Sequence, residues 1–220
     1  MGEYSKALSF YEKALEIFEK NLPPNHPDLA SSYNNIGGVY HNMGEHSKAL
    51  SFYEKALQIE QKSLPSNHPH VTSSYNNIGM VYHNMGEYSK ALSFYEKALE
   101  IFEKTLSPNH PSLANSYNNI GTVYGDMGEY SKALSFCDKA LEIRQKTLPR
   151  NHPLSANSYN NIGIMYDKIG QYSKALSFYE KALEIRQKTL PLYHPDLANS
   201  YNNIGVPNLD DLEEEFFVEF

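Results

Sequence analysis

Histidine is the residue type in this chain best suited to bind a metal. The 220 residues include nine histidines, and five of these stand before a proline at intervals of 42 residues: His26, His68, His110, His152 and His194. Equivalent positions of stacked helical units lie about 10 Å apart, as packed helices do. Zinc ligands lie about 2 Å from the ion, so these histidines cannot share one. We expect no metal site and no cofactor.

Asparagine pairs recur with the same period of 42, inside the motif YNNIG. An amide both donates and accepts hydrogen bonds, so a row of amides can hold a peptide backbone whatever its side chains are. The alternative is that the second asparagine of each pair braces the connector or the neighbouring helix. The candidate peptide-binding asparagines are Asn34, Asn35, Asn76, Asn77, Asn118, Asn119, Asn160 and Asn161.

No constellation of residues points to catalysis. Cys137 is the only cysteine, and it takes the place of Tyr53 and Tyr95 in an apolar pattern. We therefore expect a buried thiol and not a redox centre. No nucleophile with a base and an orienting group stands out, nor a phosphate-binding loop or a pair of acids. The chain is not expected to be an enzyme.

The charge of the chain is concentrated in residues 206–220. This segment holds six acidic residues and no Lys or Arg. Residues 1–205 hold the other 20 acidic residues and all 19 basic ones, so this part of the chain is nearly neutral. Nucleic acid is an unlikely partner, because neutralising phosphates needs a basic stripe. There is no apolar run of about 18 residues and no signal segment, and a single cysteine fits a reducing compartment. We expect a cytoplasmic protein without a membrane contact.

The period of 42 predicts pairs of helices. From Pro27 to about Asn42, apolar and small residues recur at steps of three and four, which is one face of a helix. Pro27 suits the first helical position, and Gly44 supplies the left-handed turn that ends it. From Glu45 to about Lys62 a second helical pattern follows. We call the first helix of each repeat the A helix and the second the B helix.

The core positions of one repeat have the order and spacing of a known motif: Tyr33, Ile36, Gly37 and Tyr40, then Gly44, Ala49, Tyr53 and Ala56. They resemble the tetratricopeptide repeat. The period of 42 and the segments HPDLA, YNNIG and YEKALEI resemble the repeats of kinesin light chains. The resemblance implies an all-α fold, a right-handed α-solenoid of antiparallel helix pairs. It does not imply motor membership, because the heptad segment that joins kinesin light chains to the heavy chain is absent.

The resemblance also implies that the A helices line a concave groove that receives peptides or helices. Spacing from the core places Ser31, Asn34, Asn35, Gly38, His41 and Asn42 of the first full repeat in that groove. The copies differ at these positions, which include the candidates His41, His83, Met80, Thr122, Ile164 and Lys168. The differences indicate either selectivity or neutral drift. Lys168 is the only basic residue among them, so strong binding of acidic peptides is not expected.

The repeat divides the chain into a half repeat (1–24), four full repeats (25–192), a partial repeat (193–205) and an acidic aromatic tail (206–220). The tail could form a cap helix through Leu209, Leu212 and Phe216, occupy a groove as a pseudo-ligand, or have no function. The lone first B helix and the incomplete last A helix are complementary, so head-to-tail self-association is a further hypothesis.

The favoured function is a non-catalytic scaffold that binds peptide segments of protein partners in the concave groove, as an adaptor does. One alternative is a structural, self-assembling helical module. Another is a regulatory repeat domain cut from a larger protein.

Overall fold

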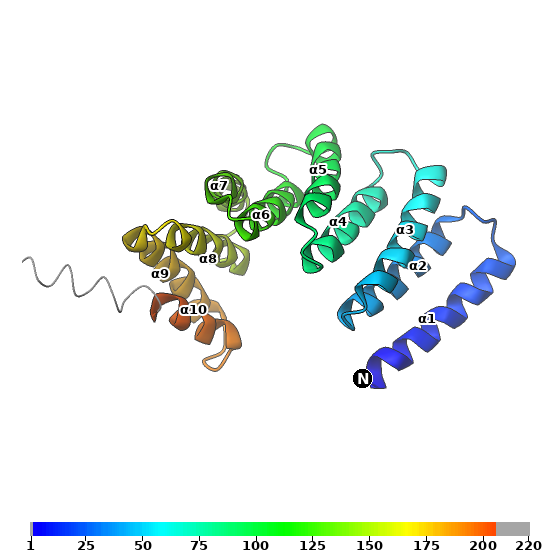
Figure 1. Ribbon diagram of the computed structural model, residues 1–220, viewed down its shortest axis with the longest axis horizontal. Coiled ribbons are helices and arrows are strands. Elements are labelled where there is room, and N and C mark those ends of the chain that lie inside the picture. The colour runs from blue at the N-terminus through cyan, green and yellow to red at the C-terminus, as the bar shows by residue number, and fades with distance from the viewer. Residues whose placement is uncertain (1, 206–220) are drawn as a thin grey trace, which may run out of the picture. The chain divides into compact units, whose positions relative to one another are not determined.

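The computed structural model describes residues 2–205, and every regular element in this range is an α-helix (Figure 1). The helices alternate in length as A and B helices. Their bounds are α1 Gly2–Asn21, α2 Pro27–Asn42, α3 His46–Ser63, α4 Pro69–Asn84, α5 Tyr88–Thr105, α6 Pro111–Asp126, α7 Tyr130–Thr147, α8 Pro153–Lys168, α9 Tyr172–Thr189 and α10 Pro195–Gly205. The hypotheses for the tail concern residues outside this range.

The predicted helix pair is confirmed. The A helix α2 runs from Pro27 to Asn42 as expected, and the B helix α3 begins one residue later than expected, with Glu45 as its N-cap. Gly44, between them, has a φ of 75°, which is the left-handed conformation that glycine adopts without strain. Its N–H donates to the carbonyl of His41 at 2.9 Å. Proline and glycine thus set the bounds of the repeat.

The five recurring histidines cap the A helices. In each repeat the Nδ1 atom of the histidine accepts a hydrogen bond from the backbone N–H two residues later, at 3.1–3.3 Å. An acceptor at this place satisfies one of the N–H groups that the first helical turn leaves unpaired. The histidines His26, His68, His110, His152 and His194 are therefore explained as structural caps.

The helices fall into two compact units, residues 1–106 and 107–220. In unit 1 the consecutive helices from α1 to α5 pack on one another, and in unit 2 the consecutive helices from α6 to α10 do the same. Within unit 2 the A helices α6 and α8 also touch each other. Packing between sequence neighbours is the arrangement of an α-solenoid, in which no central core exists.

Small residues set the distance between the two helices of a repeat. A Cβ atom built on Gly37 of α2 would lie 2.9 Å from the ring of Tyr53 on α3. Ala49 and Ala56 of α3 are fully buried, as is Ile36 of α2. The tyrosine ring therefore lies directly on the glycine backbone, and the aliphatic side chains fill the space around it.

Cys137 occupies the position of that tyrosine in the third full repeat. Its thiol is buried, as the sequence predicted. A Cβ atom built on Gly121 would lie 2.8 Å from the Cys137 Sγ atom. Burial raises the pKa of the Cys137 thiol to about 12. A thiol that remains protonated at neutral pH is a poor nucleophile, so Cys137 acts as a small core residue.

Substituting Gly37 by alanine should destabilise unit 1 by about 1–3 kcal/mol, because the new methyl group overlaps the Tyr53 ring. Gly38→Ala is the matched control, since a Cβ there would meet the Tyr53 hydroxyl at 3.6 Å, an ordinary contact. Alanine is favoured over glycine within a helix by about 1 kcal/mol, so the control should be neutral or stabilising. Urea unfolding followed by circular dichroism measures both, and equal midpoints would contradict the contact.

Candidate functional site

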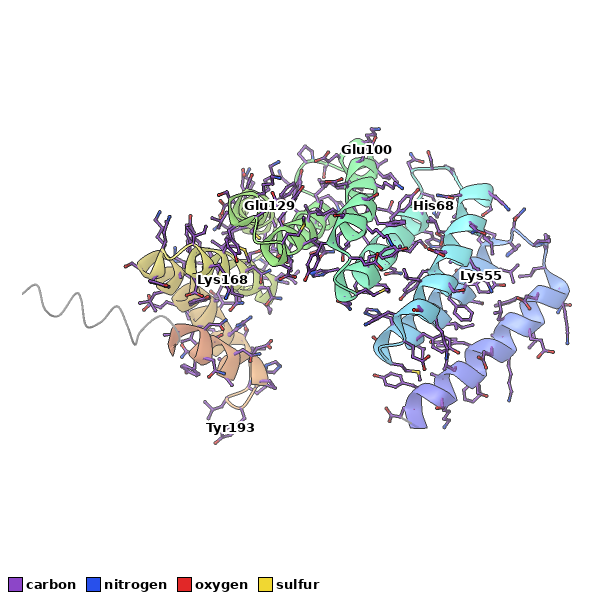
Figure 2. The ribbon with its side chains drawn as sticks, in the orientation of Figure 1. Lys55, His68, Glu100, Glu129, Lys168 and Tyr193 are labelled. Carbon is purple, nitrogen blue, oxygen red and sulfur yellow. The ribbon has the colours of Figure 1, made fainter. Side chains whose placement is uncertain are left out.

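The candidate asparagines lie in the middle of the A helices α2, α4, α6 and α8. Asn35 is exposed, and the other seven are half-buried. Side chains along these helices are drawn in Figure 2. The structure thus places the candidates at equivalent sites of successive helices, but their hydrogen bonds differ from repeat to repeat.

The first asparagine of each pair is engaged within the protein in three different ways. Asn34 donates from Nδ2 to Glu60 Oε1 at 3.1 Å and to Ser74 Oγ at 3.2 Å. Asn76 donates to the carbonyl of Thr72 at 3.1 Å, and its Oδ1 is buried without a hydrogen-bond partner. Asn118 and Asn160 each accept a hydrogen bond from the second asparagine of the next repeat, as described below.

Two second asparagines of unit 2 brace neighbouring A helices. Asn161 Nδ2 donates to Asn118 Oδ1 at 3.1 Å, and Asn203 Nδ2 donates to Asn160 Oδ1 at 2.9 Å. These bonds correspond to the bracing alternative raised from the sequence. Within the described range 2–205, no side-chain hydrogen bond of Asn35, Asn77 or Asn119 is found, so the amides of these three second asparagines are available to another molecule.

The two candidate histidines lie near the ends of their A helices. His41 is half-buried, with its ring 5.8 Å from that of His46 and its Nε2 3.5 Å from Asn84 Nδ2. Burial, and then the neighbouring His46, lower the pKa of His41. His83 is also half-buried and packs against Tyr88 at 5.8 Å. Both histidine rings therefore pack against an aromatic ring of the following B helix.

The remaining candidates vary in character. Met80, Thr122 and Ile164 are half-buried, and Thr122 Oγ1 donates to the carbonyl of Asn118 at 2.9 Å. Lys168 is exposed at the C-terminal end of α8 (Figure 2). Gly125 takes the position that His41 and His83 have in the earlier repeats, and it is buried. A Cβ atom built on Gly125 would lie 2.6 Å from the Met165 side chain. This part of unit 2 is therefore filled by the neighbouring helix.

One position of the B helix carries functional groups that the sequence pattern did not predict. The copies there are Phe18, Glu60, Phe102, Arg144 and Arg186. Glu60 is 1% exposed, Arg144 is 4% exposed and Arg186 is 8% exposed. Three of the five copies thus bury an ionisable group where the other two carry phenylalanine. Comparing the copies on the B helix, as was done on the A helix, would have revealed it.

Glu60 is a buried carboxylate with one unsatisfied oxygen. Its Oε1 accepts from Asn34, whereas Oε2 is buried without a hydrogen-bond partner. Burial raises the pKa of Glu60 above its usual value, and bonds from Ser74 and Asn34 and the nearby His68 and His70 oppose this shift. An ionised carboxylate in such a site is unfavourable.

Arg144 and Arg186 each join three helices of unit 2. Arg144 Nη1 donates to Ser158 Oγ at 2.6 Å and to the carbonyl of Leu154 at 2.9 Å. Arg186 Nη1 donates to Ser200 Oγ at 2.7 Å. No carboxylate pairs with either guanidinium among residues 2–205. Their positive charges are therefore hydrogen-bonded but not neutralised.

Two other classes of site are absent from the described range. No group of three or more His, Cys, Asp or Glu side chains in it is placed to hold a metal ion. None of its helices is long and apolar enough to span a membrane.

A family model of the tetratricopeptide repeat matches residues 1–62, 70–146 and 120–188. The chain belongs to the tetratricopeptide repeat family. Its 42-residue repeats are of the kinesin light chain-like type, as the structural neighbours show. Tetratricopeptide repeat scaffolds generally mediate protein–protein interactions and are generally non-catalytic. A search of curated proteins found no match.

Among solved structures, BtubC (BKLC) of P. vanneervenii is 28% identical, with a TM-score of 0.77 over 88% of this chain and 77% of that one. A kinesin light chain-like protein of Podosopora anserina with nearly identical TPR-like repeats is 26% identical, with a TM-score of 0.73 over 86% of this chain and 89% of that one. RapI in its apo form is 23% identical, with a TM-score of 0.74 over 85% of this chain and 65% of that one, and shares the fold.

Replacing Glu60 by glutamine should stabilise the protein at neutral pH, by about 1–3 kcal/mol if the unsatisfied charge is relieved in full. Glutamine keeps an oxygen for Asn34. Because the pKa of Glu60 is raised in the folded state, the penalty is complete above that pKa and vanishes below the unfolded value of about 4.3. The gain from Glu60→Gln should therefore shrink as the pH falls toward 4.

Urea midpoints at pH 7 and pH 4 measure this difference, with Glu54→Gln on the exposed side of α3 as the control. A lower midpoint of Glu60→Gln at pH 7 would show that the carboxylate is stabilising in its site.

Proposed function

We propose that this chain is a non-catalytic adaptor that binds extended peptide segments of partner proteins along its A helices. The observation that carries the proposal is the row of asparagines at equivalent sites of successive A helices. Within each unit, amides at equivalent sites of neighbouring A helices suit a ligand with regularly spaced backbone groups. The kinesin light chain-like character of the repeats supports the same conclusion.

The amides of Asn77 and Asn119 are the leading candidates for this contact. Both are half-buried, so a ligand would meet them without having to order a long, mobile side chain. The Nδ2 group of Asn161 is already engaged by Asn118, which leaves its oxygen for a ligand. We therefore assign backbone binding first to Asn77 and Asn119.

Buried charges extend the range of ligands beyond what the A helices suggest. Lys168 was the only basic residue counted among the groove positions, but Arg144 and Arg186 add two cations from B helices of unit 2. Charge in a site of low dielectric constant is screened less than charge on the surface. Acidic segments are therefore reasonable ligands for unit 2, whereas Glu60 disfavours them in unit 1.

The test is the double substitution Asn77→Ala and Asn119→Ala, with a phage-displayed library of random 12-residue peptides as the probe. Peptides selected on the unsubstituted chain should bind the variant at least about tenfold more weakly, since two amides with about 1 kcal/mol for each hydrogen bond are lost. Asn67→Ala with Asn109→Ala is the control, because both asparagines are exposed in connectors. Unchanged binding of the groove variant would overturn the assignment.

Self-association is a second candidate, and one contact favours it. Tyr53 of α3 lies on Gly37 and is 3% exposed, whereas Tyr11, its counterpart on α1, is 38% exposed. Gly205 of α10 is the counterpart of Gly37, and no atom of the described residues 2–205 lies within 4 Å of its Cβ position. A second copy could therefore bring Tyr11 onto Gly205 and complete the helix pair, in a head-to-tail contact.

Sedimentation velocity over a range of concentrations tests this contact. The average mass of the 220-residue chain should rise with concentration, and Tyr11→Asp should abolish the rise. Tyr193→Asp is the control, since Tyr193 projects from the connector between α9 and α10 (Figure 2). A mass equal to that of the monomer at every concentration would exclude association.

A further inference from the structure

Each buried arginine of unit 2 also holds the amide of an exposed asparagine. Arg144 Nη2 donates to Asn115 Oδ1 at 3.1 Å, and Arg186 Nη2 donates to Asn157 Oδ1 at 3.3 Å. Asn115 lies on α6 and Asn157 on α8, at the repeat position of Ser31, two residues before the YNN motif. We refer to each such pair as an arginine–asparagine couple.

Chemistry fixes the direction of the amide in each couple. A guanidinium has donors only, so the amide must turn its oxygen toward the arginine. The NH2 group of Asn115 and that of Asn157 then point away from the buried cation. Asn34 in unit 1 occupies a different position of its A helix, three residues after the equivalent Ser31, and it presents Nδ2 to the carboxylate of Glu60. In both units the amide thus turns toward the buried B-helix residue the atom that its charge requires.

The arginines are themselves held in place. The Nη1 atom of each guanidinium donates to a serine hydroxyl of the next A helix, Ser158 for Arg144 and Ser200 for Arg186. The same Nη1 atom also donates to a backbone carbonyl of that helix. Side chains that are already ordered lose little entropy when a ligand binds. The exposed asparagines therefore present NH2 groups that are oriented before a ligand arrives.

The two members of a couple vary together between the copies. Residues 29 positions apart are Ser31 with Glu60, Ser73 with Phe102, Asn115 with Arg144, and Asn157 with Arg186. Asparagine thus occurs where the partner is arginine, and serine occurs where the partner is glutamate or phenylalanine. This pairing follows the hydrogen bond that joins the two positions in unit 2.

We propose that Arg144 and Arg186 are positioning residues that turn the NH2 groups of Asn115 and Asn157 outward as a pair of donors. The pair receives two oxygen acceptors of one ligand segment, and this inference rests on the proposed peptide-binding function. Equivalent positions one repeat apart are separated by about 10 Å. A ligand segment in the polyproline II conformation advances about 3.1 Å per residue with three residues per turn, so residues three positions apart lie on one face at about 9 Å. The two oxygens therefore belong to ligand residues three positions apart, either as side-chain carboxylates or as backbone carbonyls.

The decisive variant is Asn115→Asp with Asn157→Asp in the full chain. Aspartate keeps an oxygen toward the arginine but replaces the outward NH2 group by a second oxygen, so the donors are lost while the fold is retained. Two capped ten-residue peptides serve as probes, one of glycine and serine only and one with two glutamates three positions apart. Nitrogen-15 NMR of the side-chain amides should show the Asn115 and Asn157 signals shifting on titration of the unsubstituted chain.

Binding should weaken about tenfold for each lost donor that meets a charged oxygen, with the thermal midpoint unchanged or raised. Asn109→Asp with Asn151→Asp adds the same charge on exposed connectors of unit 2 and should have a much smaller effect. Arg144→Phe with Arg186→Phe, which copies Phe18 and Phe102, should also weaken binding although neither arginine touches the ligand. A preference for the glutamate peptide would identify carboxylates as the acceptors, and equal binding would identify backbone carbonyls.

Binding of both probes by the aspartate variant at the unsubstituted affinity would overturn the inference. So would an unsubstituted chain that selects library peptides through Asn77 and Asn119 but shows no shift at Asn115 and Asn157. An unsubstituted chain that selects no peptide at all would instead overturn the proposed function.

Discussion

The contact between an A-helix glycine and a B-helix ring controls the rest of the repeat. No side chain separates Gly37 from Tyr53, so the two helices approach to a distance that any larger residue would increase. The same contact joins Gly79 to Tyr95 and, in unit 2, Gly163 to Tyr179. Because the contact recurs, the A and B helices of these repeats approach to the same distance. Within a unit, the side chains of an A helix therefore keep the same placement relative to their B helix.

A fixed helix distance limits where the copies can differ. The position of Glu60 lies beyond the glycine contact, where the A and B helices of one repeat meet the A helix of the next. Phenylalanine occupies the equivalent position in two copies, and a charged side chain occupies it in three. A charge there needs hydrogen-bond partners, and Ser74, Ser158 and Ser200 supply hydroxyl groups from the next A helix. The fold therefore accepts two solutions at this junction without a change in helix spacing.

Local signals explain which features could be predicted from the sequence. The bounds of α2 follow from Pro27 and Gly44, which act within their own turns. The buried charges are different, because an arginine in LEIRQK has the appearance of a solvated helix face. Its burial depends on a helix ten or more residues further along the chain. The capping role of His26 and its equivalents was also missed, since the sequence analysis considered histidine as a ligand for metals.

The buried arginines are not required by the framework, and this is the reason to connect them with function. Phenylalanine at the same position avoids the cost of removing a cation from water, so a repeat without the charge is available within the same chain. Arg144 meets three acceptors, yet its Nε is buried without a partner. An apolar side chain at this position would stabilise the fold about as well as the buried arginine does. What it does change is the orientation of the exposed amide above it, and an orientation matters only to a molecule that binds there.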